Sequence, residues 1–446
     1  MGDSKTLGSS AHPLLDCEVN VDQHKSSSSF SSPSVESEEG LINETQAISN
    51  LTNAVIGVGV LSIPWAFRLS GYISLVLILV TILATSATAR FIGSALDLAR
   101  KCPEAVTVPP QGRDFAFLAQ IAFGSKSRML ISAVTILEIW FALITFMVMN
   151  AVNAQLLWPS LGSSSAMLAS CALMALNAFA PMKTLSYLSL ISSAALFSGS
   201  VAVIGAALTM PVWSNPYDHL GGPALVQISN VPRSIGIIVF CFAGHPCFPM
   251  VHQSMRNHEQ WLPCVGITFS LAFAYYGFIG TFGYLVFGED LQASFTQNLD
   301  QLENAMVWRN LSACGFLIKI QLTAPMLLKA IMAAAWPPSK SGPEWPLGRT
   351  AGLWCLAGLT AFVAIAFADD VATVASLTGS LFTMTTSVIF PAAVHAQLIR
   401  RSQRDGHGAE KVSDARFIIH GLVLTFGFVM AISGTALAVV DIMSGS

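Results

Sequence analysis

The stretch "AVIGVGVLSIPWAF" (Ala54–Phe67) is apolar enough to lie in a lipid bilayer, yet it contains Gly57, Gly59 and Pro64. Glycine weakens a helix and proline interrupts its hydrogen bonds, so this stretch predicts a membrane helix that is broken partway along its length. Backbone N–H and C=O groups freed by a break are tolerated at membrane depth only where they face protein, water or a ligand. We therefore expect this break to line a polar site inside the membrane.

A second apolar stretch repeats the pattern, because "GHPCFP" (Gly244–Pro249) has the same Gly-x-x-x-x-Pro spacing as "GVLSIP" (Gly59–Pro64). Paired spans interrupted by Gly and Pro in the two halves of a chain are typical of transporters built from inverted repeats, whose binding site lies at the breaks. Ordinary kinks are the alternative, since Gly and Pro are common in membrane helices. Two matched breaks favour the inverted repeat.

Composition and apolar runs place most of the chain in the membrane. Of its 446 residues, 53% are hydrophobic and 11% are charged. Apolar runs of about 20 residues, the length that crosses a bilayer as a helix, recur along the chain. The sequence therefore predicts an all-α polytopic membrane protein with about eleven transmembrane helices. The predicted spans are residues 45–67, 72–96, 129–155, 164–182, 185–210, 233–255, 261–288, 306–335, 350–368, 372–397 and 414–441.

The predicted spans form two five-span repeats, residues 45–210 and 233–397, followed by an extra helix at 414–441. Together they make one transmembrane transporter domain, residues 44–441. Residues 1–43 are rich in Ser and Glu and poor in aromatics, so they cannot bury a core and are predicted to be a disordered tail. No apolar segment with a cleavage site precedes the first span, so we expect no cleavable signal peptide.

Basic residues set the expected orientation of the spans. Arg100 and Lys101 follow the second span, and Arg400 and Arg401 follow the tenth; most other Lys and Arg residues also fall in these alternate loops. The opposite loops carry mainly acids. The positive-inside rule then places the N-terminal tail in the cytosol. An odd number of spans places the C-terminus outside the cell or in an organelle lumen.

Sequence motifs in and around the two breaks are shared with one transporter family. They are "NLTNAVIGVGVLSIPWAFRLSGY" (Asn50–Tyr72), "CFAGHPCFPMVHQSMRNHEQW" (Cys241–Trp261), "YLVFGED" and "FTQNL" (within Tyr284–Leu299) and "KIQLTAP" (Lys319–Pro325). Through them the chain resembles the amino acid/auxin permease family, in particular the eukaryotic vacuolar and vesicular amino acid transporters. The resemblance implies a leucine-transporter-like fold of five plus five inverted spans plus one extra helix. It also implies amino acids as substrates and commonly a proton gradient as the driving force.

The resemblance further implies which residues hold the substrate. The second break would contribute Gly244, His245 and Pro246. Freed amides at the start of the outer half-helix suit a carboxylate, because the positive end of the helix dipole lies there. Pro246 stands where family members often have a small apolar residue, which leaves the identity of the amino acid open. The first break would bind the backbone groups of the substrate through Ile56, Gly57, Val58, Gly59, Val60 and Leu61.

Three ionisable residues within the predicted spans are candidates for coupling, because a charge at membrane depth costs roughly 2.5–3.5 kcal/mol. Lys319 lies near the place where related folds hold a coupling cation, so its ammonium could replace sodium. Glu138 is a candidate proton carrier or partner of Lys319, and His245 can titrate near physiological pH. The alternatives are structural: a pairing for Lys319 and a neutral hydrogen bond in the break for His245. Other polar residues that could line the path are Asn50, Asn53, Thr323, Thr378 and Ser380.

The remaining residues give no sign of a different chemistry. The eight cysteines show no CxxC pair or His/Cys spacing suited to zinc, so we expect small buried hydrophobes, no metal site and no cofactor. No HExxH or comparable catalytic constellation lies in the spans, and no basic cluster with aromatics suggests nucleic acid. We therefore expect that the protein is not an enzyme and binds no nucleic acid.

The sequence favours a secondary active transporter of neutral amino acids, coupled to protons as a symporter or antiporter and working by alternating access around the two breaks. Its expected location is a vacuolar or lysosomal-type membrane, with the N-terminus cytosolic and the C-terminus lumenal. The alternatives are a sodium-coupled amino acid permease of the plasma membrane and an amino-acid sensor that signals through its N-terminal tail. Expected partners are the amino acid, protons or sodium, the lipid bilayer, and trafficking or signalling proteins that bind the tail.

Overall fold

The computed structural model describes residues 41–106, 108, 112–180, 182–208, 225–301, 306–335, 345–404 and 414–444. All of these except Leu41 belong to one compact unit that begins at Ile42. The predicted tail therefore lies almost wholly outside the described residues. The described part is nearly all helical, and the β-bridge found within it joins Ile42 to Met255.

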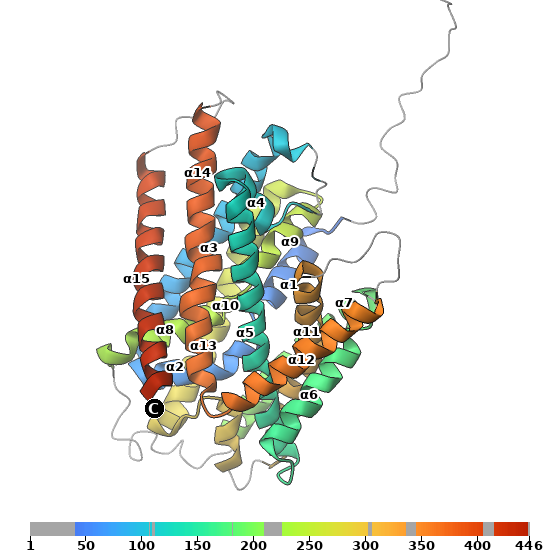
Figure 1. The fold of residues 1–446 in the computed structure, drawn as a ribbon. Helices are drawn as coiled ribbons and strands as arrows, with labels where there is room; N and C mark the ends of the chain where they lie inside the picture. Colours follow the sequence, from blue (N-terminus) through green and yellow to red (C-terminus); the bar gives the residue numbers. More distant parts are fainter. Residues whose placement is uncertain are drawn as a thin grey trace, which may run out of the picture. The chain divides into compact units, whose positions relative to one another are not determined.

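Helices follow one another along the whole described chain (Figure 1). The first break lies between α1 (Glu44–Val55) and α2 (Ile63–Ser70), and the second between α8 (Val231–Phe240) and α9 (Phe248–Ser254). The other α-helices are α3 (Ile73–Arg100), α4 (Phe115–Phe123), α5 (Ser125–Leu157), α6 (Ser163–Asn177), α7 (Met182–Leu208), α10 (Trp261–Phe287), α11 (Met306–Ala335), α12 (Leu347–Ala366), α13 (Val371–Leu377), α14 (Phe390–Arg404) and α15 (Asp414–Ser444).

The described residues confirm a polytopic helical membrane protein. The bent pair Glu44–Val55 and Val58–Ser70 adds a ninth candidate span, and Ser163–Asn177 and Ile191–Ala206 are shorter apolar helices. The count of eleven spans and the two five-span repeats stay predictions. Eight helical stretches are long and apolar enough to cross a membrane, namely Ile73–Arg100, Ser125–Leu157, Ile228–Ser254, His258–Asp290, Met306–Ala335, Leu347–Ala366, Val371–Arg404 and Phe417–Met443.

Local sequence explains why the first broken span starts and stops where it does. Asn43 caps α1 through a reciprocal pair of hydrogen bonds with Gln46, whose N–H donates to the Asn43 side chain at 2.9 Å. α1 ends because the backbone becomes extended at Ile56, where φ is −94° and ψ is 97°, and stays extended at Gly57, where φ is −119° and ψ is −168°. A 3₁₀ turn, Val58–Ser62, leads into α2, where Pro64 lies in the first turn and has no N–H to be satisfied. Each half of the span is therefore a properly terminated helix.

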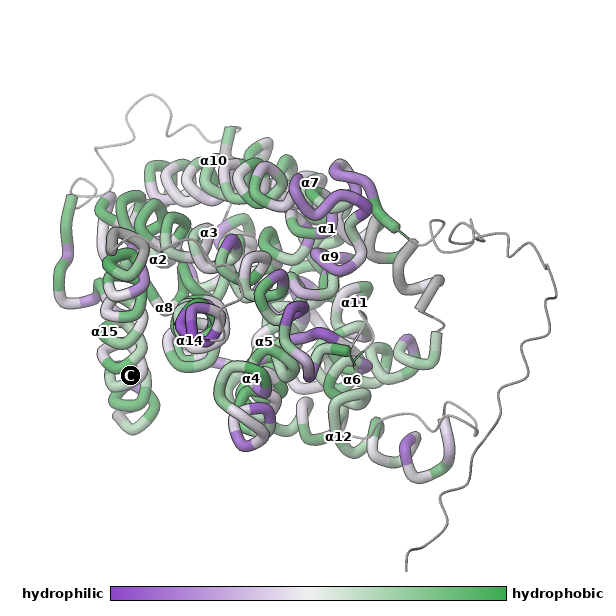
Figure 2. The backbone as a smooth tube through the Cα atoms, turned by 90° about the horizontal axis from the view of Figure 1, so that it is seen from above, coloured by the Kyte–Doolittle hydropathy of each residue, from purple (hydrophilic) through white to green (hydrophobic). Residues whose placement is uncertain are grey.

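The helices around the breaks pack against long neighbours. α10 contacts α1, α2 and α3, whereas α11 packs on α7 and α5, and α15 packs on α8. In Figure 2, hydrophobic residues predominate along the helices, and hydrophilic residues gather at ends such as that of α14. Large apolar side chains are exposed on outer faces, for example Leu83 at 62% and Phe362 at 72%. Such faces are expected of helices that contact lipid.

Two helical features and one group of side chains differ from the sequence-based expectations. α4 is an additional short helix that ends at Gly124, where φ is +91° and glycine is favoured. Between α13 and α14 the chain forms a π-helix, Thr378–Ile389, of a kind that often occurs at functional sites. The prediction that the cysteines are buried is wrong for three of them, Cys247, Cys314 and Cys355, which are exposed. Cys314 lies on α11 and Cys355 on α12, both membrane-spanning helices, where exposure to lipid suits an apolar thiol.

Candidate functional site

The first break places a short piece of uncoiled backbone in the middle of the packed helices. The break bends the span by 44°. Among residues 56–61, Gly57 alone is not buried. A Cβ added at Gly57 would meet no atom within 4 Å among the described residues outside its chain neighbours, so this glycine faces open space. The open space beside its Cα is the part of the predicted substrate-binding stretch that a ligand could approach.

The second break is a tighter structure. The N–H groups of Cys241, Phe242 and Ala243 donate to carbonyls three residues earlier, at 2.8–3.3 Å, which tightens the end of α8. Gly244 and a 3₁₀ turn, His245–Cys247, complete the break before α9 begins. Pro246 lies in the first turn of this segment, where the missing proline N–H is harmless.

The two breaks pack against each other through glycines. A Cβ added at Gly59 would lie 2.7 Å from the Sγ of Cys241, and one added at Gly244 would lie 2.8 Å from the carbonyl oxygen of Ala54. Distances below 3 Å are too short for a real Cβ, so both positions require a side chain no larger than hydrogen. The close approach that Gly59 permits is therefore between two helices of the protein.

The free ends of α1 and α9 are also joined. The N–H of Ile42 donates to the carbonyl of Ser254 at 2.8 Å, and the N–H of Arg256 donates to the carbonyl of Ile42 at 3.0 Å. These bonds tie the segment before α1 to the last residue of α9 and to the segment that follows it. The half-helices α1 and α9 are thus held together both at the breaks and at their far ends.

Tyr276 of α10 connects the two breaks and was not identified from the sequence. Its hydroxyl lies 2.8 Å from the carbonyl oxygen of Val55 and 3.2 Å from that of Cys241. The N–H of Gly57 donates to the same hydroxyl at 3.3 Å. Three backbone groups from two broken spans therefore meet at one side chain. No local motif marks this tyrosine, because its partners are far away in the sequence.

His245 points from the second break toward α3. Its Nε2 lies 3.0 Å from the carbonyl oxygen of Thr85 and 3.2 Å from the hydroxyl of Thr88. A carbonyl oxygen can only accept a hydrogen bond. In the neutral imidazole, the proton is therefore on Nε2, which donates to the carbonyl of Thr85. Thr88 in turn donates to the carbonyl of Ser387 in the π-helix at 2.6 Å. The ring thus joins the second break to α3, and through Thr88 the contact continues to the π-helix.

Lys319 of α11 lies beside the end of α1. Its side chain is 1% exposed, and its ammonium donates to the Oδ1 of Asn53 at 3.1 Å. The hydroxyl of Ser193 donates to the same oxygen at 2.7 Å. Asn53 lies in the last turn of α1, where the negative end of the helix dipole favours a cation. Within the described part of the chain, no carboxylate lies within ion-pair distance of Lys319.

Glu138 of α5 lies against the π-helix. Its side chain is 2% exposed, and Oε2 accepts a hydrogen bond from the hydroxyl of Thr386 at 2.8 Å. Oε1 has no hydrogen-bond partner among the described residues. The idea that Glu138 is the partner of Lys319 is therefore wrong, since each has a different neutral partner. The reason is geometric, because Lys319 faces α1 whereas Glu138 faces the π-helix.

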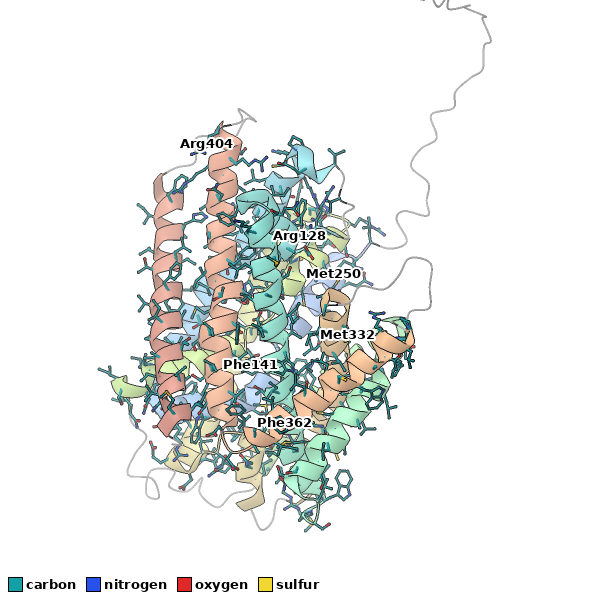
Figure 3. All side chains as sticks on the ribbon, viewed as in Figure 1. Arg128, Phe141, Met250, Met332, Phe362 and Arg404 are labelled. Atoms are coloured by element: carbon teal, nitrogen blue, oxygen red, sulfur yellow. The ribbon has the colours of Figure 1, made fainter. Side chains whose placement is uncertain are left out.

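Polar residues lead along α1 to the first break. Gln46 and Asn50 are exposed, and Asn53 and Gly57 are half-buried at the same helical spacing. Polar residues on a membrane helix usually face a water-filled space or the inside of a bundle. α9 contacts α1. On α9, Met250 is 67% exposed, and Cys247, the residue before α9, is also exposed (Figure 3). The α1 side of the break is thus more open than its surroundings.

The α2 side of the break is covered. The hydroxyl of Ser62 donates to the carbonyl of Ala293 at 3.1 Å, and the guanidinium of Arg68 donates to the carbonyl of Leu291. Beneath this cover lies a cavity of about 10 Å³, room for about one water molecule and too small for an amino acid. Its lining residues are Val60, Leu61, Ser200, Val203, Ile279, Phe295 and Phe316.

Comparison with known proteins agrees with this architecture. Residues 41–436 match the family described as "Transmembrane amino acid transporter protein". The amino acid transporter AVT1J of Arabidopsis thaliana is 24% identical over 452 residues, which cover 95% of this chain and 99% of that protein. The amino acid transporter AVT1C of the same plant is 27% identical over 404 residues, which cover 87% of this chain and 68% of that protein.

A relative from an animal points the same way. The vesicular inhibitory amino acid transporter of Xenopus tropicalis is 24% identical over 405 residues, which cover 86% of this chain and 76% of that protein. The resemblance predicted from the motifs is confirmed, and so is the expectation that the protein is not an enzyme. Because the match to the family covers most of the chain, this protein belongs to the transmembrane amino acid transporter family.

Proposed function

We propose that the protein is a secondary active transporter that moves neutral amino acids across a vacuolar or other organellar membrane by alternating access around its two breaks. The observation that carries this proposal is the pair of broken spans packed break to break, with open space beside the Cα of Gly57, where a side chain would otherwise lie. Membership of the transmembrane amino acid transporter family supports the substrate class. The names of the relatives, one of them vesicular, support an organellar membrane.

The surroundings of the first break favour an uncharged substrate side chain. The cavity beside Val60 and Leu61 is lined by aliphatic and aromatic groups, and its hydroxyl, that of Ser200, is hydrogen-bonded to Tyr275. The charged ends of a free amino acid would instead meet backbone groups. The N–H of Gly57 suits the carboxylate, and carbonyls at the end of α1 suit the ammonium. A neutral side chain needs no further charge in this site.

For coupling, we assign different tasks to the three ionisable residues. Lys319 provides a fixed cation at the end of α1, held by Asn53, in the position where a sodium ion would otherwise be needed. Glu138 carries the proton, because one of its carboxylate oxygens is unpartnered among the described residues and the other has a neutral donor. His245 keeps a structural task, since Nε2 is already used by Thr85.

The arrangement in the membrane completes the proposal. The basic loops after the second and tenth spans place the N-terminus in the cytosol. Eleven spans, in two inverted repeats plus one extra helix, then place the C-terminus in the lumen. The polar side of α1 and the exposed Cys247 then face the cytosol, while the cover over α2 closes the lumenal side. In this conformation an amino acid would approach the break from the cytosol.

Uptake by purified protein in liposomes tests the proposal. A radiolabelled mixture of neutral amino acids is supplied under an imposed pH gradient or an imposed sodium gradient. Uptake that follows the pH gradient and collapses with a protonophore supports proton coupling. Uptake that follows the sodium gradient would contradict proton coupling and favour the alternative function, a sodium-coupled permease of the plasma membrane. Saturable binding without flux would favour an amino-acid sensor instead.

A further inference from the structure

Tyr276 is fully buried, and its hydroxyl is surrounded by backbone groups of both broken spans. The carbonyls of Val55 and Cys241 and the N–H of Gly57 all lie within 2.8–3.3 Å of it. These groups lie where the helical hydrogen-bond ladders of α1 and α8 end, so the breaks leave them in need of partners. A side chain from a third span, α10, supplies those partners.

A phenol hydroxyl has one proton to donate and two lone pairs to accept with. The N–H of Gly57 can use a lone pair, but the two carbonyls compete for the single proton. The shorter contact, to Val55, is favoured in this conformation. A small shift of one break relative to the other would move the proton to Cys241. The hydroxyl can therefore satisfy either broken span without leaving its place.

The ring of Tyr276 is held firmly enough to act as a reference point. It packs edge-on against Phe242 of the second break, with ring centroids 5.3 Å apart. It also contacts Tyr275, its neighbour on α10. α10 itself is one continuous helix from Trp261 to Phe287, in contact with both α1 and α2. The hydroxyl is thus fixed by a helix that has no break of its own.

We propose that Tyr276 is a positioning residue for amino acid transport, whose hydroxyl sets the spacing of the two breaks and holds the N–H of Gly57 ready for a carboxylate. This rests on the function proposed above. The contact to Gly57 is the longest of the three, at 3.3 Å, and a carboxylate is a stronger acceptor than a phenol. An arriving substrate can therefore take the N–H while the hydroxyl keeps the carbonyls in place.

Adjacent tyrosines provide a matched pair of variants. Tyr276→Phe removes the hydroxyl at the breaks, whereas Tyr275→Phe removes a hydroxyl that bonds to Ser200 of α7. Both changes delete one oxygen from the same helix. In liposome uptake, we expect Tyr276→Phe to raise the KM for the transported amino acid about tenfold, as for loss of one well-placed hydrogen bond, and to lower the maximal rate less. Tyr275→Phe should leave the KM within about twofold of the wild type.

A KM that is unchanged in Tyr276→Phe, or raised equally in Tyr275→Phe, would overturn the proposal. Hydrogen–deuterium exchange of the substrate-free protein gives a second readout that needs no transport. Peptides that contain the two breaks should exchange faster in Tyr276→Phe than in Tyr275→Phe, and equal rates would also overturn it. If the wild type takes up no amino acid, the proposed function fails, while the exchange measurement still decides whether Tyr276 holds the breaks.

Discussion

The two breaks share a sequence pattern but differ in structure. The first bends its span by 44° and contains extended residues, whereas the second is a series of tight helical turns within the stretch Ile228–Ser254. The first therefore frees backbone groups and leaves Gly57 facing open space. The second keeps most of its hydrogen bonds internal and directs His245 to Thr85. This difference suggests that the first break holds the substrate and the second supports it.

The largest expected effect comes from the contact between the breaks. Gly59→Val should abolish uptake, because a Cβ there would lie 2.7 Å from the Sγ of Cys241 and would push the second break away. Overpacking of this kind costs roughly 1–3 kcal/mol. Uptake and membrane abundance are measured together, with Gly358→Val on α12 as the control that adds the same side chain into open space away from the breaks. Normal uptake by Gly59→Val would show that the contact is dispensable.

A smaller but still severe loss is expected at the end of α1. Lys319→Ala should reduce uptake driven by a pH gradient at least tenfold, because the last turn of α1 loses its fixed cation and Asn53 loses its charged partner. Asn53→Ala should show a milder defect, since the ammonium remains. Uptake driven by sodium that survives Lys319→Ala would contradict the role of Lys319 and favour the permease alternative.

Glu138→Gln separates coupling from binding. The amide oxygen can still accept a hydrogen bond from Thr386, but the side chain can no longer carry a proton. We expect exchange of amino acid across the membrane to continue while accumulation against a gradient is lost. Thr386→Val is the matched control, because it removes the hydrogen bond and leaves the carboxyl. Full accumulation by Glu138→Gln would rule out Glu138 as the proton carrier.

The smallest effect is expected at the second break. His245→Asn should keep uptake within about threefold of the wild type, because an amide N–H can replace Nε2 as the donor to Thr85. The dependence of uptake on pH should also be unchanged. His245→Leu, which keeps bulk but loses the donor, should be the worse variant. An altered pH profile in His245→Asn would make the second break part of the coupling machinery.

Much of the architecture was predictable from local features of the chain. Runs of apolar residues identified the polytopic helical fold, and the glycines and Pro64 located the first break, because each acts on its own stretch of backbone. The break motifs also led to the correct family. The π-helix Thr378–Ile389 was not predicted. Gly379 lies near its start, but what that glycine permits is a close approach to the backbone of Gly236, which depends on how the spans pack.

The sequence by itself determined that the protein is a polytopic helical membrane protein and where the first span breaks, because hydrophobicity and backbone preference are properties of neighbouring residues. Only the tertiary structure decided the partners of the polar groups. Lys319 meets Asn53, 266 residues away, and Tyr276 meets Val55, 221 residues away. Buried polar groups take whichever donor or acceptor the packing brings within 3 Å, and that choice depends on how the spans are arranged in space.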